Sequence, residues 1–168
     1  MKAQRKMINF ITFSFTLFIL ASCTNLPSRT ELFSDNQEEI PVLWLINDIT
    51  LEQRIPDIEL KEKIPDTLIM LGNKYEIQVI YNNTTQYNST SHLLCTLWIR
   101  EQEYTRGLDT YNSITVIITL INPQSQKVIL RALHTEETED SLKSFQHLFT
   151  ILEELFIQIK NQIDLRKH

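Results

Sequence analysis

The C-terminal segment carries an apolar stripe that strongly constrains how this chain can fold. From Ser141 onward, large apolar residues recur three or four positions apart over about six helical turns, which predicts an amphipathic α-helix. Such a helix must bury its stripe, and the preceding strands supply a sheet for it to cover. Asp140 or Ser141 is the expected N-cap. The stripe consists of Leu142, Phe145, Leu148, Phe149, Leu152, Leu155, Phe156, Ile159 and Ile163.

The middle of the chain is rich in alternating and β-branched residues, which predict strands. Residues 113–121 (SITVIITLI) form the clearest strand, and turn chemistry at 122–125 joins it to a strand over 127–135 as a hairpin. Three further strands are expected over 41–46, 75–81 and 92–100, and the last of them could continue through Glu103-Tyr104-Thr105. A helix is expected from about Asp57 to Leu71, with Gly72 and Asn73 as its C-terminal stop.

This order of elements predicts an α+β fold. We expect a single mixed or antiparallel sheet of about five strands, with two helices packed on one face. The second of these is the long C-terminal amphipathic helix.

The N-terminus has the pattern of a secretory signal. Lys2, Arg5 and Lys6 precede an apolar stretch over 7–20, which is shorter than the roughly 20 residues of a spanning helix. The sequence Leu20-Ala21-Ser22-Cys23 resembles the lipobox of bacterial lipoproteins, an aliphatic residue and two small residues before a cysteine. The resemblance implies cleavage before Cys23 and lipid on its thiol. A diacylglyceryl chain pair there, usually with a third acyl chain on the new amine, suffices for stable anchoring. The alternatives are an ordinary signal peptide, or a signal anchor in which Cys23 is incidental.

The predicted organisation follows from this cleavage point. Residues 1–22 are the signal peptide, residues 23–38 are the lipid anchor and a flexible tether, and residues 39–168 are a single α+β periplasmic domain. The alternative for the tether is a segment that becomes ordered on a partner. Thr24 stands where aspartate favours inner-membrane retention in enterobacteria, so we expect the periplasmic face of the outer membrane.

Charge and composition exclude several classes of function. Removal of residues 1–22, with three basic residues and no acidic one, changes the formal net charge from −5 to −8. A domain with this net negative charge is a poor nucleic-acid binder, because the phosphate backbone is also negative. The chain has only two glycines, which excludes Gly-rich phosphate loops. Cys95 has no cysteine partner once Cys23 is lipidated, and we interpret it as a buried strand thiol rather than a reactive site.

No group of residues predicts catalysis, a cofactor site or a metal site. The four histidines, His92, His134, His147 and His168, lack metal-ligand spacing. The acidic run at 136–140 could bind a cation, but a solvated start of the last helix explains it better. We therefore expect that the protein is not an enzyme and has no evident small-molecule substrate.

Residues 100–112 (REQEYTRGLDTYN) gather aromatic and arginine side chains around Gly107. Such side chains are the usual anchors of interfaces, so Tyr104, Arg106, Leu108 and Tyr111 are the candidate partner surface. The competing interpretation is an exposed strand end and loop of ordinary composition.

The mature part also resembles small periplasmic lipoprotein domains over about residues 40–165. The shared features are a helix ending at Leu71-Gly72, a late hairpin through Asn122-Pro123-Gln124-Ser125, and a long last helix. Examples are the lipopolysaccharide-assembly lipoprotein, the penicillin-binding-protein activator lipoprotein and the amino-terminal domain of the Tol-system β-propeller protein. The resemblance implies a membrane-anchored, non-catalytic binding or assembly accessory that contacts another envelope protein. The alternative is a surface-displayed lipoprotein that meets the host or environment.

Overall fold

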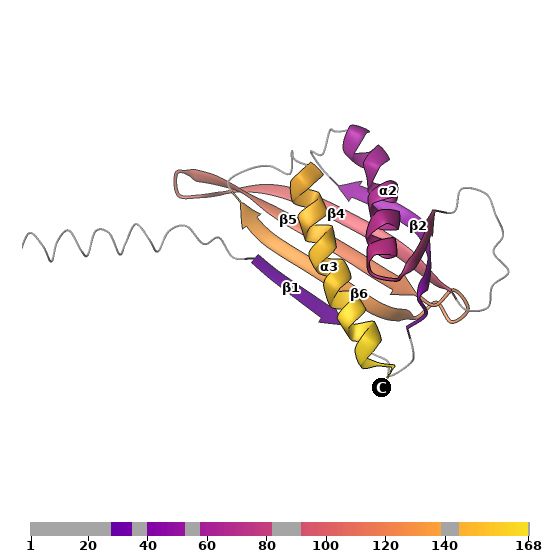
Figure 1. Cartoon of the computed structure of the whole chain (residues 1–168). Coiled ribbons are helices and arrows are strands. Elements are labelled where there is room, and N and C mark those ends of the chain that lie inside the picture. Colours follow the sequence, from indigo (N-terminus) through magenta and orange to yellow (C-terminus); the bar gives the residue numbers. More distant parts are fainter. Residues whose placement is uncertain (1–27, 35–39, 53–57, 82–91, 139–144, 168) are drawn as a thin grey trace, which may run out of the picture.

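A computed structural model of the chain describes residues 28–34, 40–52, 58–81, 92–138 and 145–167. Within these residues it is an α+β fold with one mixed six-stranded sheet and two helices (Figure 1). The strands are β1 (Ser28–Phe33), β2 (Leu43–Glu52), β3 (Gln78–Tyr81), β4 (Leu93–Arg106), β5 (Asp109–Ile121) and β6 (Val128–Thr138). The helices are α2 (Ile58–Lys74) and α3 (Phe145–Leu165).

The sheet has the strand order β1-β6-β5-β4-β2-β3. The pairs β1–β6, β6–β5 and β5–β4 are antiparallel, whereas β2 is parallel to both β4 and β3. The parallel pair of β2 and β3 is connected through α2, since parallel neighbours require a long crossover. The predicted hairpin between β5 and β6 is confirmed, and the Asn122 side-chain oxygen accepts hydrogen bonds from the backbone N–H groups of Gln124 and Ser125.

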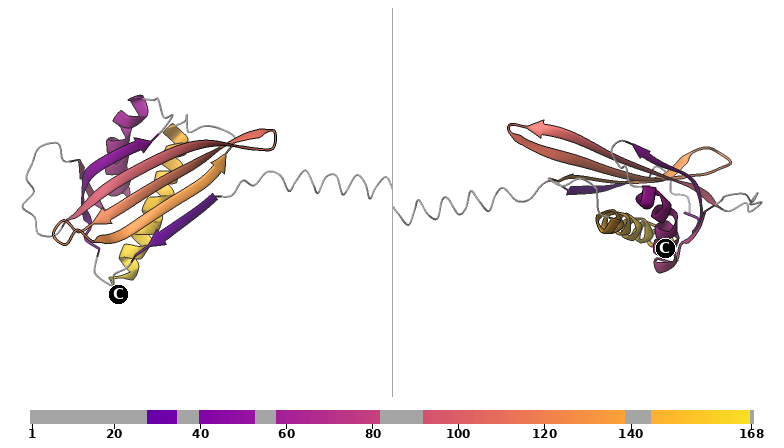
Figure 2. Two further views of the ribbon diagram at one scale, coloured as in Figure 1. Left: turned by 180° about the vertical axis from the view of Figure 1, so that it is seen from behind. Right: turned by 90° about the horizontal axis from the view of Figure 1, so that it is seen from above.

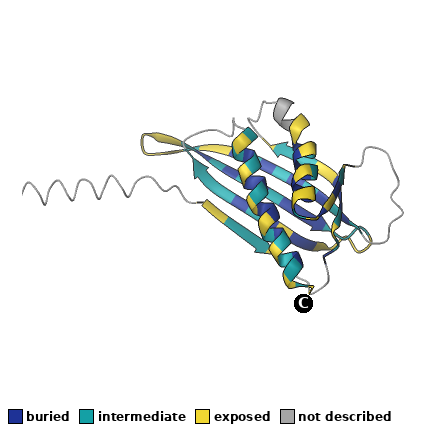
Figure 3. Ribbon diagram, in the orientation of Figure 1, coloured by how far each residue is buried: buried dark blue, intermediate teal, exposed yellow. Residues whose placement is uncertain are grey.

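Both helices cover the same face of the sheet (Figures 1 and 2). The apolar stripe of α3 faces inward, because seven residues of the helix are buried and all but Ile151 belong to the predicted stripe. The predicted amphipathic helix is therefore confirmed. Trp44 of β2 is fully buried and packs its ring against Phe156 of α3, with 5.6 Å between centroids. The core lies between this face and the helices (Figure 3).

Two parts of the predicted organisation are wrong. The sheet has six strands in the described residues rather than about five, because Ser28–Phe33 forms β1. This strand lies inside the segment predicted as a flexible tether over 23–38, so the folded unit begins before residue 39. The sequence of Ser28–Phe33 is mostly polar and therefore did not predict a strand. A strand at the edge of a sheet needs apolar residues only on the face that meets the core. Thr30 and Leu32 face the helices, and β1 pairs along its whole length with β6.

Gly72 has a different role from the predicted helix stop. The helix α2 continues to Lys74, and the left-handed residue that follows it is Glu76, with φ 60°. An added Cβ at Gly72 would lie 2.5 Å from Val79 Cγ2 and 2.6 Å from the Ile77 carbonyl oxygen. Gly72 therefore allows the close approach of α2 to the β3 segment. Asp140 and Ser141, the predicted N-cap of α3, lie outside the described residues.

Candidate functional site

The face of the sheet away from α2 and α3 is not covered by any described element (Figure 2). Strand alternation places Trp98 of β4, Ile117 of β5 and Leu133 of β6 there, all partly exposed. Phe33 of β1 is 49% exposed on the same side. A hollow of about 520 Å³ opens on this face, lined by Phe33, Ile117, Val128, Arg131 and Leu133. We call this surface the open face.

The β4–β5 hairpin extends beyond the rest of the sheet (Figures 1 and 2). The pairing of β2 with β4 ends at Arg100, and the pairing of β6 with β5 ends at Asn112. Beyond these positions β4 and β5 continue to pair with each other as far as Arg106 and Asp109. The two-stranded end of the hairpin therefore has no described neighbour strand on either side. The predicted continuation of the 92–100 strand through Glu103-Tyr104-Thr105 agrees with β4, whereas the matching start of β5 at Asp109 lies in residues that were interpreted as an exposed strand end and loop.

The structure brings the predicted partner-surface residues together on this hairpin. Tyr104 and Tyr111 are directly paired across the strands, and their rings stack with centroids 5.8 Å apart. Arg106 lies two residues beyond Tyr104 on the same strand face. Gly107 adopts φ 68° in the turn, and Leu108 beside it is fully exposed. Whether these residues bind a partner stays a prediction.

The environment of Tyr104 is mixed in charge. Burial of the phenol and the nearby Glu137 carboxylate raise the pKa of Tyr104, while the charge of Arg106 acts in the opposite direction. Tyr104 is therefore a neutral phenol at physiological pH. Its apolar ring and polar hydroxyl suit an interface that is dry on one side and wet on the other.

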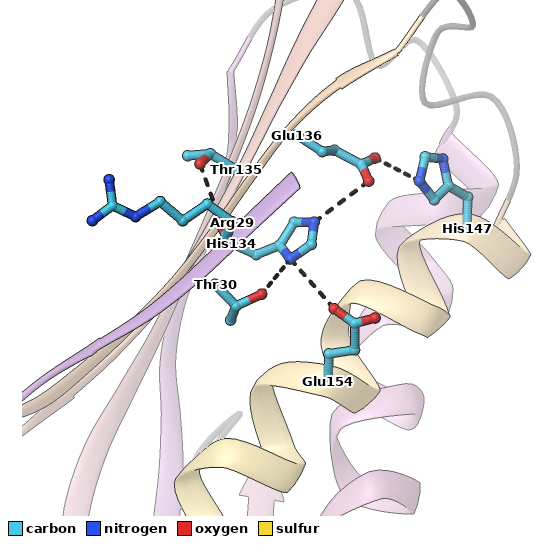
Figure 4. A network of polar contacts seen from close by, with 7 residues as sticks. All are labelled: Arg29, Thr30, His134, Thr135, Glu136, His147 and Glu154. Carbon is cyan, nitrogen blue, oxygen red and sulfur yellow. Dashed lines mark hydrogen bonds and ion pairs between the residues drawn. The ribbon is translucent and has the colours of Figure 1, made fainter. Parts of the chain in front are cut away.

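A second polar group lies on the covered face, between the sheet and α3 (Figure 4). His134 of β6 is only 2% exposed, and its Nδ1 is 2.9 Å from Thr30 Oγ1 on β1 and 3.5 Å from Glu154 on α3. Its Nε2 is 3.4 Å from the Glu136 carboxylate, which also lies 2.5 Å from His147 on α3. The cluster thus links β1, β6 and α3 at a position where the core would otherwise be apolar.

Glu136 is the centre of this cluster. Burial favours the neutral acid, but the hydrogen bond with His134 and the positive charge of His147 outweigh it and lower the pKa of Glu136. The interpretation of residues 136–140 as a solvated helix start is therefore wrong for Glu136, whose side chain is 15% exposed and lies on β6. The alternation of side chains along the strand could have identified this position, because Glu136 follows the buried residues Ala132 and His134 at intervals of two.

The predicted buried position of Cys95 is confirmed. The thiol lies on β4 among the residues of the covered face and is 2% exposed. Burial in apolar surroundings raises the pKa of Cys95 to about 12. The thiol is therefore protonated at physiological pH and is a poor nucleophile.

The described residues contain neither a metal-binding group nor a membrane-spanning helix. No group of three or more His, Cys, Asp or Glu side chains there is arranged to hold a metal ion. In the histidine cluster the carboxylate of Glu136 lies between the two imidazoles, so the three side chains do not converge on one point (Figure 4). No helix in the described part of the chain is long and apolar enough to cross a membrane.

Comparison with known proteins gives matches by structure alone. No protein-family model matches this chain, and no curated protein matches its sequence. Similar solved structures include a PelC dodecamer from Paraburkholderia phytofirmans, at 17% identity and a TM-score of 0.49, covering 77% of this chain and 97% of that one.

Other similar structures are described as bacterial lipoproteins. Lipoprotein GNA1162 from Neisseria meningitidis has 12% identity and a TM-score of 0.38, with 71% of this chain and 97% of that chain covered. A minor lipoprotein from Acinetobacter baumannii has 17% identity and a TM-score of 0.33, with 71% and 94% covered. At these values the similarity carries no argument about the function of this chain.

Proposed function

We propose that this protein is a membrane-anchored bacterial lipoprotein that acts as a non-catalytic binding or assembly accessory in the cell envelope. The observation that carries the binding role is the open face, which exposes large apolar side chains while the opposite face buries the core under two helices. The support for the anchor is the lipobox-like sequence ending at Cys23. Thr24 favours the outer membrane as the location of the anchor.

The side chains of the open face suit a protein partner. Trp98 and Arg131 belong to the residue types that contribute most to protein interfaces, and they lie among the aliphatic residues Ile117 and Leu133. The hollow between β1, β5 and β6 can accept an apolar side chain of a partner. The acidic character of the chain argues against nucleic acid. The partner is therefore another envelope protein with an apolar patch.

The anchor is tested by replacing the cysteine in the full-length precursor. Cys23→Ser is expected to abolish incorporation of labelled palmitate, and any form of it that loses residues 1–22 should move from the membrane fraction into the soluble fraction. A conservative Ser22→Ala control keeps a small residue before the cysteine and should retain both properties. If Cys23→Ser is processed and still fractionates with the membrane as the wild type does, or if labelled palmitate never appears on the wild type, the anchor proposal fails.

The binding role is tested by site-specific photo-crosslinking in intact cells. A photoreactive amino acid at Ile117 on the open face is expected to give a covalent adduct with one other envelope protein. The matched control is Met70, an apolar residue of α2 that is 51% exposed on the helix side. An adduct at Met70 but not at Ile117 contradicts the proposal. An adduct with twice the mass of the chain indicates a second copy and contradicts the proposal that the partner is a different envelope protein.

A further inference from the structure

The length of the β4–β5 extension can be compared with the start of β1. Ser28, the first residue of β1, is opposite Glu136, which is opposite Ile114 of β5. From Ile114 the strand continues outward for five more residues to Asp109, where the turn begins. At about 3.3 Å per residue the extension projects about 17 Å beyond the level of Ser28.

The chain that precedes β1 has nearly the same reach. Cys23 is five residues before Ser28, and five residues span at most about 17 Å. The start of β1 and the tip of the β4–β5 hairpin lie at the same end of the sheet (Figures 1 and 2). A membrane that holds lipid on Cys23 is therefore within reach of the hairpin tip. With the strands upright, the short connection cannot lift the tip clear of the bilayer surface.

The tip has the chemistry of a membrane–water interface. Leu108 is fully exposed at its end, and an isolated aliphatic side chain in this position gains nothing from the protein core. The stacked pair of Tyr104 and Tyr111 lies behind it, and tyrosine is enriched at the level of lipid headgroups. Arg106 faces Asp109 across the strands, so the tip carries no excess of positive charge. Contact would depend on the apolar and aromatic groups rather than on anionic lipid.

We propose that the β4–β5 hairpin tip is a second membrane contact, in which Leu108 enters the headgroup region of the bilayer that carries the Cys23 lipid. This inference rests on the proposed lipid anchor and assigns a lipid surface as the partner of the Tyr104, Arg106, Leu108 and Tyr111 surface. The Cys23 lipid and the hairpin tip can each reach about 17 Å beyond Ser28, so both can touch the same membrane. Together they would fix the orientation of the domain, with the plane of the open face roughly perpendicular to the membrane.

The test uses the mature protein as the cell processes it, mixed with phosphatidylcholine vesicles. Leu108→Cys and Ser125→Cys are each labelled with an environment-sensitive fluorophore, while buried Cys95 stays unlabelled in the folded protein. Ser125 lies in the β5–β6 turn at the opposite end of the sheet and is the matched control. We expect the emission from position 108 to shift to the blue and to be quenched by brominated lipid. Emission from position 125 should stay that of a water-exposed probe. Added phosphatidylglycerol should leave both signals unchanged.

The possible results separate the two proposals. If the protein fails to float with the vesicles, the anchor is disproved and the second contact fails with it. If it floats while both probes report water, the anchor stands and the hairpin contact is overturned. A blue shift at position 108 without quenching by brominated lipid identifies a second copy of this chain as the occupant and also overturns the membrane contact.

Discussion

The two faces of β5 show how differently one strand can be used. On the covered face, Val116, Ile118 and Leu120 are completely buried under the helices. On the open face, the neighbouring Ile117 is partly exposed and lines the hollow. Ile117 and Ile118 thus have identical side chains at adjacent positions of one strand, but one is partly exposed and the other is buried.

This difference indicates that the fold needs only one of the two faces for its stability. The helices α2 and α3 remove the covered face from water, and burial of apolar surface is the main favourable term in folding. The aliphatic residues of the open face gain much less from folding because water still reaches them. The proposed binding role assigns these residues to contact with a partner protein.

The largest expected effect separates the two isoleucines. Ile118→Ala leaves a cavity in the covered core and should lower the free energy of unfolding by about 2–5 kcal/mol. Ile117→Ala removes a partly exposed side chain and should cost less than about 1 kcal/mol. Urea denaturation of both variants measures the two losses. Equal losses would contradict the distinction between the faces.

The two glycines give the next largest difference. Gly72→Ala places a methyl group against Val79 and the Ile77 carbonyl, and such overpacking should cost about 1–3 kcal/mol. Gly107→Ala meets no atom within 4 Å, and only its φ of 68° opposes the change. This strain should cost about 1 kcal/mol, confined to the hairpin tip. Thermal unfolding ranks the two variants, and a lower midpoint for Gly107→Ala than for Gly72→Ala would refute the close packing of α2.

Glu136 provides a pH-dependent effect on the covered face. Because the folded protein lowers the pKa of Glu136, its ionised carboxylate stabilises the fold at pH values above its ordinary pKa of about 4.5. This contribution is lost as the pH falls through the lowered pKa. Glu136→Gln removes the charge but keeps the shape, and should cost about 1 kcal/mol at neutral pH.

Urea denaturation of the wild type and Glu136→Gln between neutral and acidic pH tests this linkage. The difference in unfolding free energy between the two proteins should shrink as the solution becomes more acidic. Glu137→Gln, on the same strand but on the open face, is the control for loss of a carboxylate from β6. A difference between wild type and Glu136→Gln that grows on acidification would contradict the assigned sign.

The sequence was sufficient for the elements with strong periodicity. The stripe of α3 and the alternation of β5 predicted a helix and a hairpin that the structure confirms, because each pattern leaves one way to bury its apolar residues. The edge strand β1 was missed because pairing with β6 supplies its hydrogen bonds, so few apolar residues are needed. The role of Gly72 was misassigned because close packing against Val79 depends on a segment that the helix pattern does not include.

The candidate surfaces were only partly predictable. The aromatic and arginine residues around Gly107 were visible as a group, but the extension that presents them depends on where β2 and β6 stop pairing. The link between Glu136 and His147 joins β6 to α3 and requires tertiary structure. Two helices on one face of the sheet were predicted, which implies an uncovered face, but the side chains that gather there depend on the register of β1, β6 and β5, which the sequence pattern does not supply.

The smallest expected effect concerns the reactivity of two adjacent positions on β4. Cys95 faces the core, and because burial raises its pKa to about 12, its thiolate is essentially absent at mildly alkaline pH. Thr96 faces the open side, and Thr96→Cys should leave stability nearly unchanged while introducing an accessible thiol. Iodoacetamide is therefore expected to modify position 96 in the folded variant and to leave Cys95 unmodified until urea unfolds the chain. Mass spectrometry of the digested protein measures both. Rapid modification of Cys95 in the folded wild type would show that α2 and α3 do not exclude solvent from the covered face. The two faces would then not differ in accessibility as described.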